Sequence, residues 1–187
     1  MNGKRTSETL TRMAQFMTPN DANFLGHVFG GSILAMVDLT ASATAQKFSG
    51  RMCVTASFDR VDFLHPVEVG NYVEMEGSVT YVGRTSLEVT IDVYATDLTK
   101  GDKRHTNTAR VTMVALDDDG QPTEVPRLIC ETREDRIAFI EGLARRHLRQ
   151  GRAAQMADLH KRLLAASDEE LDLCASDPEA ALKHIGG

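Results

Sequence analysis

An apolar stripe at helical spacing follows a turn-rich segment near the start of the chain. The segment is TPNDANFLGHVFGG, residues 18–31, and its residue types are typical of turns. Beyond it, apolar side chains recur every three or four positions, as on one side of a helix. The stripe consists of Ile33, Leu34, Val37, Ala41, Ala45 and Phe48. This pattern predicts a helix over roughly residues 30–48, ended by Ser49 and Gly50.

Alternating apolar and polar residues then predict a series of strands. Residues 54–63, 72–82, 86–95 and 108–116 alternate with a period of two, and residues 8–17 fit a first strand weakly. Within 54–63 the apolar set shifts from Val54, Ala56 and Phe58 to Val61 and Phe63, which predicts a bulge. Clean alternation gives each strand one wet and one buried face, so we expect an antiparallel sheet curved around the helix. The expected outer face carries Glu74, Glu76, Glu88, Thr90 and Asp92.

The composition changes after Pro126, and the remaining residues read as helical. One apolar face holds Ile137, Ile140, Ala144 and Leu148, and the pattern continues with Met156, Leu159 and Leu163. Two capping boxes are predicted, Ser167 with Glu170 and Ser176 with Glu179. We therefore expect two parts: a domain over residues 1–128 and a helical C-terminal extension over residues 129–187.

Charge and cysteine usage exclude several classes of protein. The formal net charge of the 187 residues is −6, which disfavours nucleic-acid binding, although a local anion pocket stays possible. Mean hydropathy is −0.25 and the N-terminus lacks the apolar segment of a signal peptide, so we expect a cytoplasmic protein that spans no membrane. Three distant cysteines (Cys53, Cys130, Cys174) argue against a disulfide framework, and the scattered histidines predict no metal site.

Asp38 interrupts the apolar stripe of the predicted helix. It stands four residues after Leu34 and three before Ala41, so it shares their side of the helix. A carboxylate in such a place finds a partner, takes up a proton or serves a function. From the pattern alone, a hydrogen-bonded structural aspartate is the more common outcome.

Three segments in order carry a resemblance to a known family. PNDANFLGHVFGGSILAMVD, then VTASFDRVDFLHPVEVG, then YVGRTS resemble the acyl-CoA thioesterases of the hotdog fold, in the branch of short bacterial and brain-type acyl-CoA hydrolases. The similarity covers about residues 8–125. It implies an α+β fold in which a five- or six-stranded antiparallel sheet wraps a long helix. It also implies hydrolysis of acyl-CoA, and a homodimer formed through a continuous sheet, which we expect to assemble into a trimer of dimers.

The resemblance also assigns roles to particular residues. It implies that Asp38 is the general base or the nucleophile, and that Asn23 orients the water or the carbonyl from the partner subunit. A helix N-terminus offers unpaired N–H groups, and Gly30 and Gly31 would let a substrate carbonyl approach them. Ser32 is not in a nucleophile elbow, because Leu34 replaces the second glycine of that motif.

The GRTS segment is first of all a predicted hairpin turn. The resemblance places Gly83, Arg84, Thr85 and Ser86 along the pantetheine arm of coenzyme A, and it implies no cofactor beyond the CoA of the substrate. Phe29 stands where some relatives carry a histidine before the double glycine. Two alternatives remain open: an acyl-CoA-binding regulator or structural protein without catalysis, and a dehydratase of the same fold.

Overall fold

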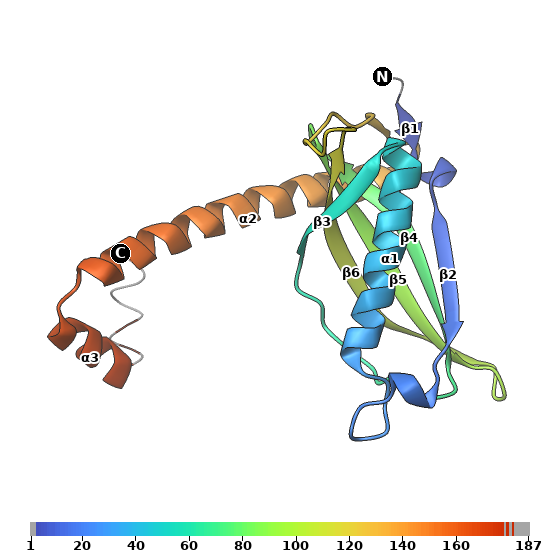
Figure 1. Ribbon diagram of the computed structural model, residues 1–187, viewed down its shortest axis with the longest axis horizontal. Helices are drawn as coiled ribbons and strands as arrows, with labels where there is room; N and C mark the ends of the chain where they lie inside the picture. The colour runs from blue at the N-terminus through green and yellow to red at the C-terminus, as the bar shows by residue number, and fades with distance from the viewer. Residues whose placement is uncertain (1–2, 178, 180, 182–187) are drawn as a thin grey trace. The chain divides into compact units, whose positions relative to one another are not determined.

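The structure is a computed structural model that describes residues 3–177, 179 and 181 (Figure 1). The chain divides into two compact units, Met1–Gly142 and Leu143–Gly187. The first unit contains the sheet and its central helix. The predicted boundary between residues 128 and 129 stays a prediction.

Helix α1, Gly30–Ser49, confirms the predicted helix and packs along one face of the sheet (Figure 1). Its buried positions recur at helical spacing and are Ile33, Met36, Val37, Thr40, Ala41, Thr44, Ala45 and Phe48. Leu34 and Asp38 are half-buried, so they lie at the border of the buried face rather than on its centre line. Gly50 ends the helix with a φ of 70°, and its N–H donates to the Gln46 carbonyl.

Five antiparallel strands form the sheet. They are β2 (Thr11–Phe16), β4 (Tyr72–Val82), β5 (Ser86–Asp97), β6 (Asp102–Leu116) and β3 (Met52–Phe58), in that spatial order. The alternation predicted for 72–82 is confirmed, because every second residue of β4 from Val73 to Tyr81 is buried. Gly77 lies where α1 crosses the sheet, and a Cβ there would collide with Thr44 and Ile91. The glycine therefore lets helix and sheet approach closely.

Strand β3 is an edge of the sheet, and its burial differs from expectation. We predicted that Val54, Ala56 and Phe58 would face inward, but all three are exposed, and Cys53 is the fully buried residue of the strand. The predicted bulge is present, but it lies earlier, between Thr55 and Ser57. Apolar residues on both faces of an edge strand produce an alternation that does not say which face is the core.

The outer face of the sheet is covered at one place. Glu74, Glu76, Thr90 and Asp92 are half-buried, but Glu88 is only 1% exposed, so its expected exposure is wrong. Its carboxylate accepts a hydrogen bond from Thr80, with 3.2 Å between the oxygens. The cover comes from the first turns of the following helix, where Phe139 packs on the Tyr81 ring and Gly142 lies against Tyr81 and Glu88.

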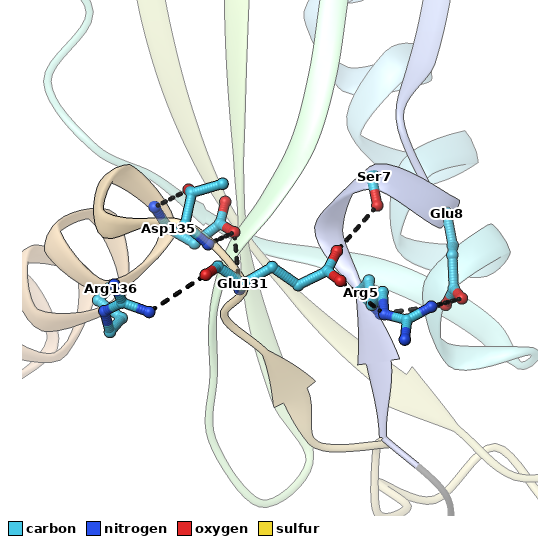
Figure 2. A network of polar contacts seen from close by, with 7 residues as sticks. Arg5, Ser7, Glu8, Glu131, Asp135 and Arg136 are labelled. Atoms are coloured by element: carbon cyan, nitrogen blue, oxygen red, sulfur yellow. Dashed lines mark hydrogen bonds and ion pairs between the residues drawn. The ribbon is translucent and has the colours of Figure 1, made fainter.

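A short parallel pair joins the two ends of the first unit. Strand β1 (Lys4–Arg5) pairs with β7 (Leu128–Ile129), and neither strand was predicted. Figure 2 shows the adjoining polar contacts, in which Glu131 accepts from Ser7 and forms an ion pair of 2.9 Å with Arg5. Two 3₁₀ turns complete the unit, η1 (Thr6–Glu8) and η2 (Pro19–Asp21).

Residues 133–176 are largely helical, as predicted. Helix α2 (Arg133–Ala165) is continuous, and α3 (Asp168–Ser176) begins with the predicted capping box of Ser167 and Glu170. The second predicted box is wrong: Ser176 ends α3, its hydroxyl donates to the Asp172 carbonyl, and Asp177 instead accepts from the Glu179 N–H. Among the described residues, no helix is long and apolar enough to cross a membrane.

Candidate active site

The start of helix α1 leaves backbone donors without a side-chain cap. Phe29 occupies the N-cap position with extended backbone and has no side-chain oxygen to accept from the first turn. The Ser32 N–H donates to the Phe29 carbonyl at 2.9 Å, whereas the amides of Gly30 and Gly31, the first two of the helix, have no acceptor in a preceding turn. The helix dipole places partial positive charge at this end. The arrangement suits an oxygen atom that carries negative charge.

Aromatic rings flank the two glycines. The Phe63 ring would lie 3.4 Å from a Cβ at Gly30, and the Phe29 ring occupies the place that a Cβ at Gly31 would need. Phe29 and Phe63 are 58% and 50% exposed. The donors therefore stand in an apolar setting that any side chain on Gly31 would disturb.

Asp38 has a partner on the edge strand. Its Oδ1 accepts a hydrogen bond from the Thr55 hydroxyl, with 2.5 Å between the oxygens. Such short contacts are typical of a hydroxyl that donates to an ionised carboxylate. The Thr55 oxygen also lies 3.4 Å from the buried Met113 sulfur, so the threonine side chain is held on both sides.

Thr55 is the residue that sequence reasoning missed. Threonine is common in strands, and its position in VTASF carries no signal of chemistry by itself. The signal available was the register shift, because bulges concentrate beside active sites and re-aim side chains. The bulge begins directly after Thr55.

Asn23 lies in a fixed loop before α1. Its side-chain oxygen accepts the N–H groups of Leu25 at 2.8 Å and His27 at 3.2 Å, while its own N–H donates to the His27 carbonyl at 2.7 Å. These contacts use the oxygen of the amide side chain and leave the amide NH₂ as the group able to donate to a ligand. Asn23 is thus held as a hydrogen-bond donor.

The loop of Asn23 is anchored to the rest of the unit on both sides. Phe29 donates its N–H to the Asp21 carbonyl at 2.7 Å, and Asp21 closes a capping box with Thr18. The backbone N–H of Thr18 holds the pKa of Asp21 below its usual range. The Nδ1 atom of His27 lies 2.8 Å from the Oε2 atom of Glu68, within hydrogen-bonding distance.

The structure brings together some of the predicted site residues but not all. Gly30, Gly31 and Asp38 share helix α1, whereas the hydrogen bonds described for Asn23 remain within residues 23–27. Seven residues separate Gly31 from Asp38, which is about 10 Å along the helix. Asn23 and Asp38 are not joined by any described contact within one chain.

The GRTS segment forms the predicted turn between β4 and β5. The Gly83 N–H donates to the Ser86 carbonyl at 2.7 Å, while the carbonyls of Arg84 and Thr85 accept from Val125 and Ala115. Through β6, Ser86 lies level with Val54, the residue before Thr55. Two strand spacings, about 10 Å, therefore separate this turn from the partner of Asp38.

No metal centre accompanies these residues. Among residues 3–177, 179 and 181, no group of three or more histidine, cysteine or carboxylate side chains could hold a metal ion. Just after β3 in the sequence, Arg60 forms an exposed ion pair of 2.8 Å with Asp62.

Comparison with known proteins places the chain in a family. The model of the thioesterase superfamily matches residues 25–101. An uncharacterized acyl-CoA thioester hydrolase of Bacillus subtilis is 37% identical over 134 residues, which cover 72% of this chain and 78% of that protein. The chain belongs to the thioesterase superfamily. Its sheet wrapped around α1 is the hotdog fold, as the resemblance implied.

Solved structures of superfamily members match most of the chain. An apo-hexameric acyl-CoA thioesterase is 38% identical with a TM-score of 0.79, covering 82% of this chain and 99% of that one. An acyl-CoA hydrolase from Staphylococcus aureus, in complex with butyryl coenzyme A, coenzyme A and coenzyme A disulfide, is 30% identical with a TM-score of 0.77. Its match covers 86% of this chain and 98% of that one.

Three further structures of the S. aureus thioesterase concern single residues. In them an asparagine, an aspartate and a threonine are each replaced by alanine. These three residues are separated by 15 and then 17 positions, as are Asn23, Asp38 and Thr55 here. The same residue types at the same separations direct attention to this trio.

Proposed function

We propose that this thioesterase-superfamily protein hydrolyses fatty acyl-CoA to a free fatty acid and CoA. The observation that carries the proposal is the Asp38–Thr55 hydrogen bond on a helix whose N-terminal amides are uncapped. Hydrolysis of a thioester needs an activated nucleophile and stabilisation of the oxyanion that forms on the carbonyl. The chain offers one group for each task.

In the proposed reaction, Gly30 and Gly31 donate their amide N–H groups to the carbonyl oxygen. Asp38 accepts the proton of a water whose oxygen adds to the carbonyl carbon, and Thr55 holds the carboxylate in place. The carbon–sulfur bond then breaks, the CoA thiolate leaves and takes up a proton, and the fatty acid remains. Asp38 acting directly as nucleophile is the alternative, with water cleaving the resulting anhydride. No cofactor takes part in either route.

Asn23 completes the site from the partner subunit. Its described oxygen contacts stay within its own loop, which leaves its NH₂ group to orient the carbonyl or the water beside the partner's aspartate. The exposed edge strand β3 supports a dimer, because Met52, Val54 and Phe58 are 66%, 46% and 39% exposed there. Pairing of two β3 edges would place Thr55, and with it Asp38, near the twofold axis.

Three further proposals concern the binding of CoA, the assembly of the dimers and the role of the helical extension. The turn Gly83, Arg84, Thr85 and Ser86 is proposed to contact the pantetheine arm of CoA, since it lies level with β3 at one end of the sheet. The dimers are proposed to assemble further into a trimer of dimers. Exposed apolar side chains of α2, such as Ile140 at 63% and Leu148 at 69%, support a role of the helical extension in this assembly.

The test of the activity is a thiol-release assay on purified protein with palmitoyl-CoA and butyryl-CoA. Asp38→Asn should keep fold and assembly but lose about 10²–10⁴-fold in turnover, the usual contribution of a general base. Near-normal hydrolysis by Asp38→Asn would refute the catalytic role. Binding of acyl-CoA without thiol release from the wild-type protein would favour the regulator instead.

The test of the shared site mixes two inactive variants. Asn23→Ala and Asp38→Ala are unfolded, mixed equally and refolded together, so that about half of the dimers contain one chain of each kind. Each mixed dimer then has one intact site, and activity should return to about a quarter of wild type. If both residues serve one site within a single chain, mixing restores nothing.

A further inference from the structure

The loop before α1 carries two apolar side chains that project from the chain. Phe24 is 109% exposed and Leu25 is 82% exposed, the two highest values among the large apolar residues of the described part of the chain. Single exposed apolar residues are common on protein surfaces, but two adjacent, fully exposed ones place a large apolar area in water, which is unfavourable. A partner or ligand that covers Phe24 and Leu25 would remove this area from water.

The backbone of the loop fixes the direction of both side chains. The Asn23 side chain accepts the Leu25 N–H at 2.8 Å, and Gly26 supplies the turn with a φ of 82°. The Gly26 N–H donates to the Asn23 carbonyl at 3.1 Å, and the Val28 N–H donates to Val67 at 2.8 Å. These contacts hold the loop closed on itself, so Phe24 and Leu25 cannot fold back onto their own core without breaking them.

If Asn23 contacts a site in the partner subunit, its sequence neighbours Phe24 and Leu25 lie close to that site as well. Consecutive Cα atoms are about 3.8 Å apart, so the Cα atoms of Phe24 and Leu25 lie within roughly 4–8 Å of the Asn23 Cα wherever the loop docks. In the proposed function that group is the thioester carbonyl or the water beside the partner's Asp38. The acyl chain is bonded to the same carbonyl carbon, so the part of a long chain beyond its first methylenes can pass Phe24 and Leu25.

A long acyl chain needs apolar side chains along its whole path away from the carbonyl. Phe29 and Phe63 already flank the glycine donors at the start of α1, and each is at least half exposed in the single chain. Every methylene of a substrate that is buried against apolar side chains strengthens binding, so a long chain gains from each apolar surface along its path. Phe24 and Leu25 supply such a surface. They follow Asn23 directly in the sequence, and the Asn23 amide is the group of this loop that is proposed to act on the substrate.

We propose that Phe24 and Leu25 of one protomer form a wall of the acyl-chain pocket in the partner's active site, and thereby set the preference for acyl-chain length. The inference rests on the proposed function, in which Asn23 reaches the partner's Asp38. Phe24 and Leu25 take no part in bond breaking and act on substrate specificity alone. The substrate's acyl chain covers this apolar surface when it is bound in the active site of the dimer.

The first experiment compares kcat/KM for butyryl-, octanoyl- and palmitoyl-CoA. In Phe24→Ala and Leu25→Ala, kcat/KM for palmitoyl-CoA should fall about tenfold more than kcat/KM for butyryl-CoA, as expected when apolar contacts to the far part of a long substrate are lost. Leu98→Ala is the matched control, because Leu98 is a 56% exposed leucine in the turn between β5 and β6. Its chain-length ratios should equal those of the wild type.

The second experiment shows which protomer provides the wall. In mixed dimers of Asp38→Ala and Asn23→Ala chains, the one intact site takes Asp38 from the second chain and Asn23 from the first. Phe24→Ala added to the Asp38→Ala chain should therefore change the chain-length ratio of the mixture, and Phe24→Ala added to the Asn23→Ala chain should leave it unchanged. The two kinds of chain carry different affinity tags, so that mixed dimers are purified before the assay.

Three results would overturn the inference. Equal chain-length ratios in Phe24→Ala, Leu25→Ala and wild type, with a weaker dimer in the variants, would make the two residues interface contacts only. A changed ratio when the Asn23→Ala chain carries Phe24→Ala would place the wall in the same chain as Asp38. Absence of any hydrolysis by the wild-type protein would overturn the proposed function and this inference together, whereas the first two results leave the proposed function intact.

Discussion

Helices α1 and α2 show two ways in which one chain uses a helix. Eight of the 20 residues of α1 are buried, whereas Gly142 alone is buried among the 33 described residues of α2. Helix α1 starts without a side-chain cap. Helix α3, which follows α2, starts with a complete capping box. Packing holds α1 in place, so its N-terminal donors need not be satisfied by the protein and stay available for a ligand.

The largest expected effect tests the difference in burial. Phe48→Ala, at a fully buried position of α1, should lower the free energy of unfolding by about 3–5 kcal/mol, because it leaves a cavity between helix and sheet. Leu148→Ala, at a 69% exposed position of α2, should change it by less than about 0.5 kcal/mol. Urea denaturation followed by circular dichroism measures both. Equal losses would mean that α2 is buried in solution by a partner.

The second prediction concerns the open start of α1. Gly31→Ala should raise helix propensity, yet reduce turnover by about 10²-fold, because the new methyl group takes the space of the Phe29 ring and displaces it beside the amide donors. Steady-state kinetics with butyryl-CoA gives the change in kcat. Wild-type turnover in Gly31→Ala would show that this end of the helix does not bind the reacting carbonyl.

Two glycines within α2 differ in what surrounds them. A Cβ at Gly142 would collide with Tyr81, so Gly142→Ala should cost about 1–3 kcal/mol of stability. No atom of the described residues lies within 4 Å of a Cβ at Gly151, so Gly151→Ala should stabilise the helix by about 0.5–1 kcal/mol. Thermal unfolding distinguishes the two. Stabilisation by both substitutions would contradict the close contact between Gly142 and the sheet.

The smallest effect concerns the capping box of η2, the 3₁₀ turn that precedes α1. The pKa of Asp21 is lowered in the folded protein by the Thr18 N–H, so its contribution to stability is present above the unfolded value of 3.8 and is lost as the pH falls below that value. Asp21 is only partly buried, so solvent screens its charge, and we expect this contribution to be less than about 0.5 kcal/mol. The stability difference between wild type and Asp21→Asn should therefore shrink between pH 7 and pH 3. A difference that is constant over this range would mean that the carboxylate charge is irrelevant.

The sequence predicted α1, the strand order along the chain and the GRTS turn, because each depends on local periodicity or turn chemistry. It did not predict the exposure of Val54 and Phe58, since an edge strand alternates like an inner one. The burial of Glu88 depends on Gly142, more than fifty positions away, and no local pattern encodes that contact.

The candidate site divides in the same way. Asp38 could be singled out because a carboxylate interrupts an apolar stripe, and the resemblance then gave it a role. Thr55 could not, because its importance comes from a contact across the fold to a helix 17 residues earlier. The spatial relation between Asn23 and Asp38 depends on a second chain, which periodicity within one chain cannot reveal.

The parallel pair of β1 and β7 has a consequence for the order of folding. Lys4 and Leu128 come from opposite ends of the first unit, so their pairing closes a loop that contains the whole sheet and α1. Closing so long a loop costs entropy that only a formed sheet offsets, and the pair should therefore assemble last and open first. In native-state hydrogen exchange, the Lys4 amide, bonded to the Arg127 carbonyl at 2.9 Å, should exchange through local opening, while the buried Val89 amide should exchange only when the whole unit unfolds.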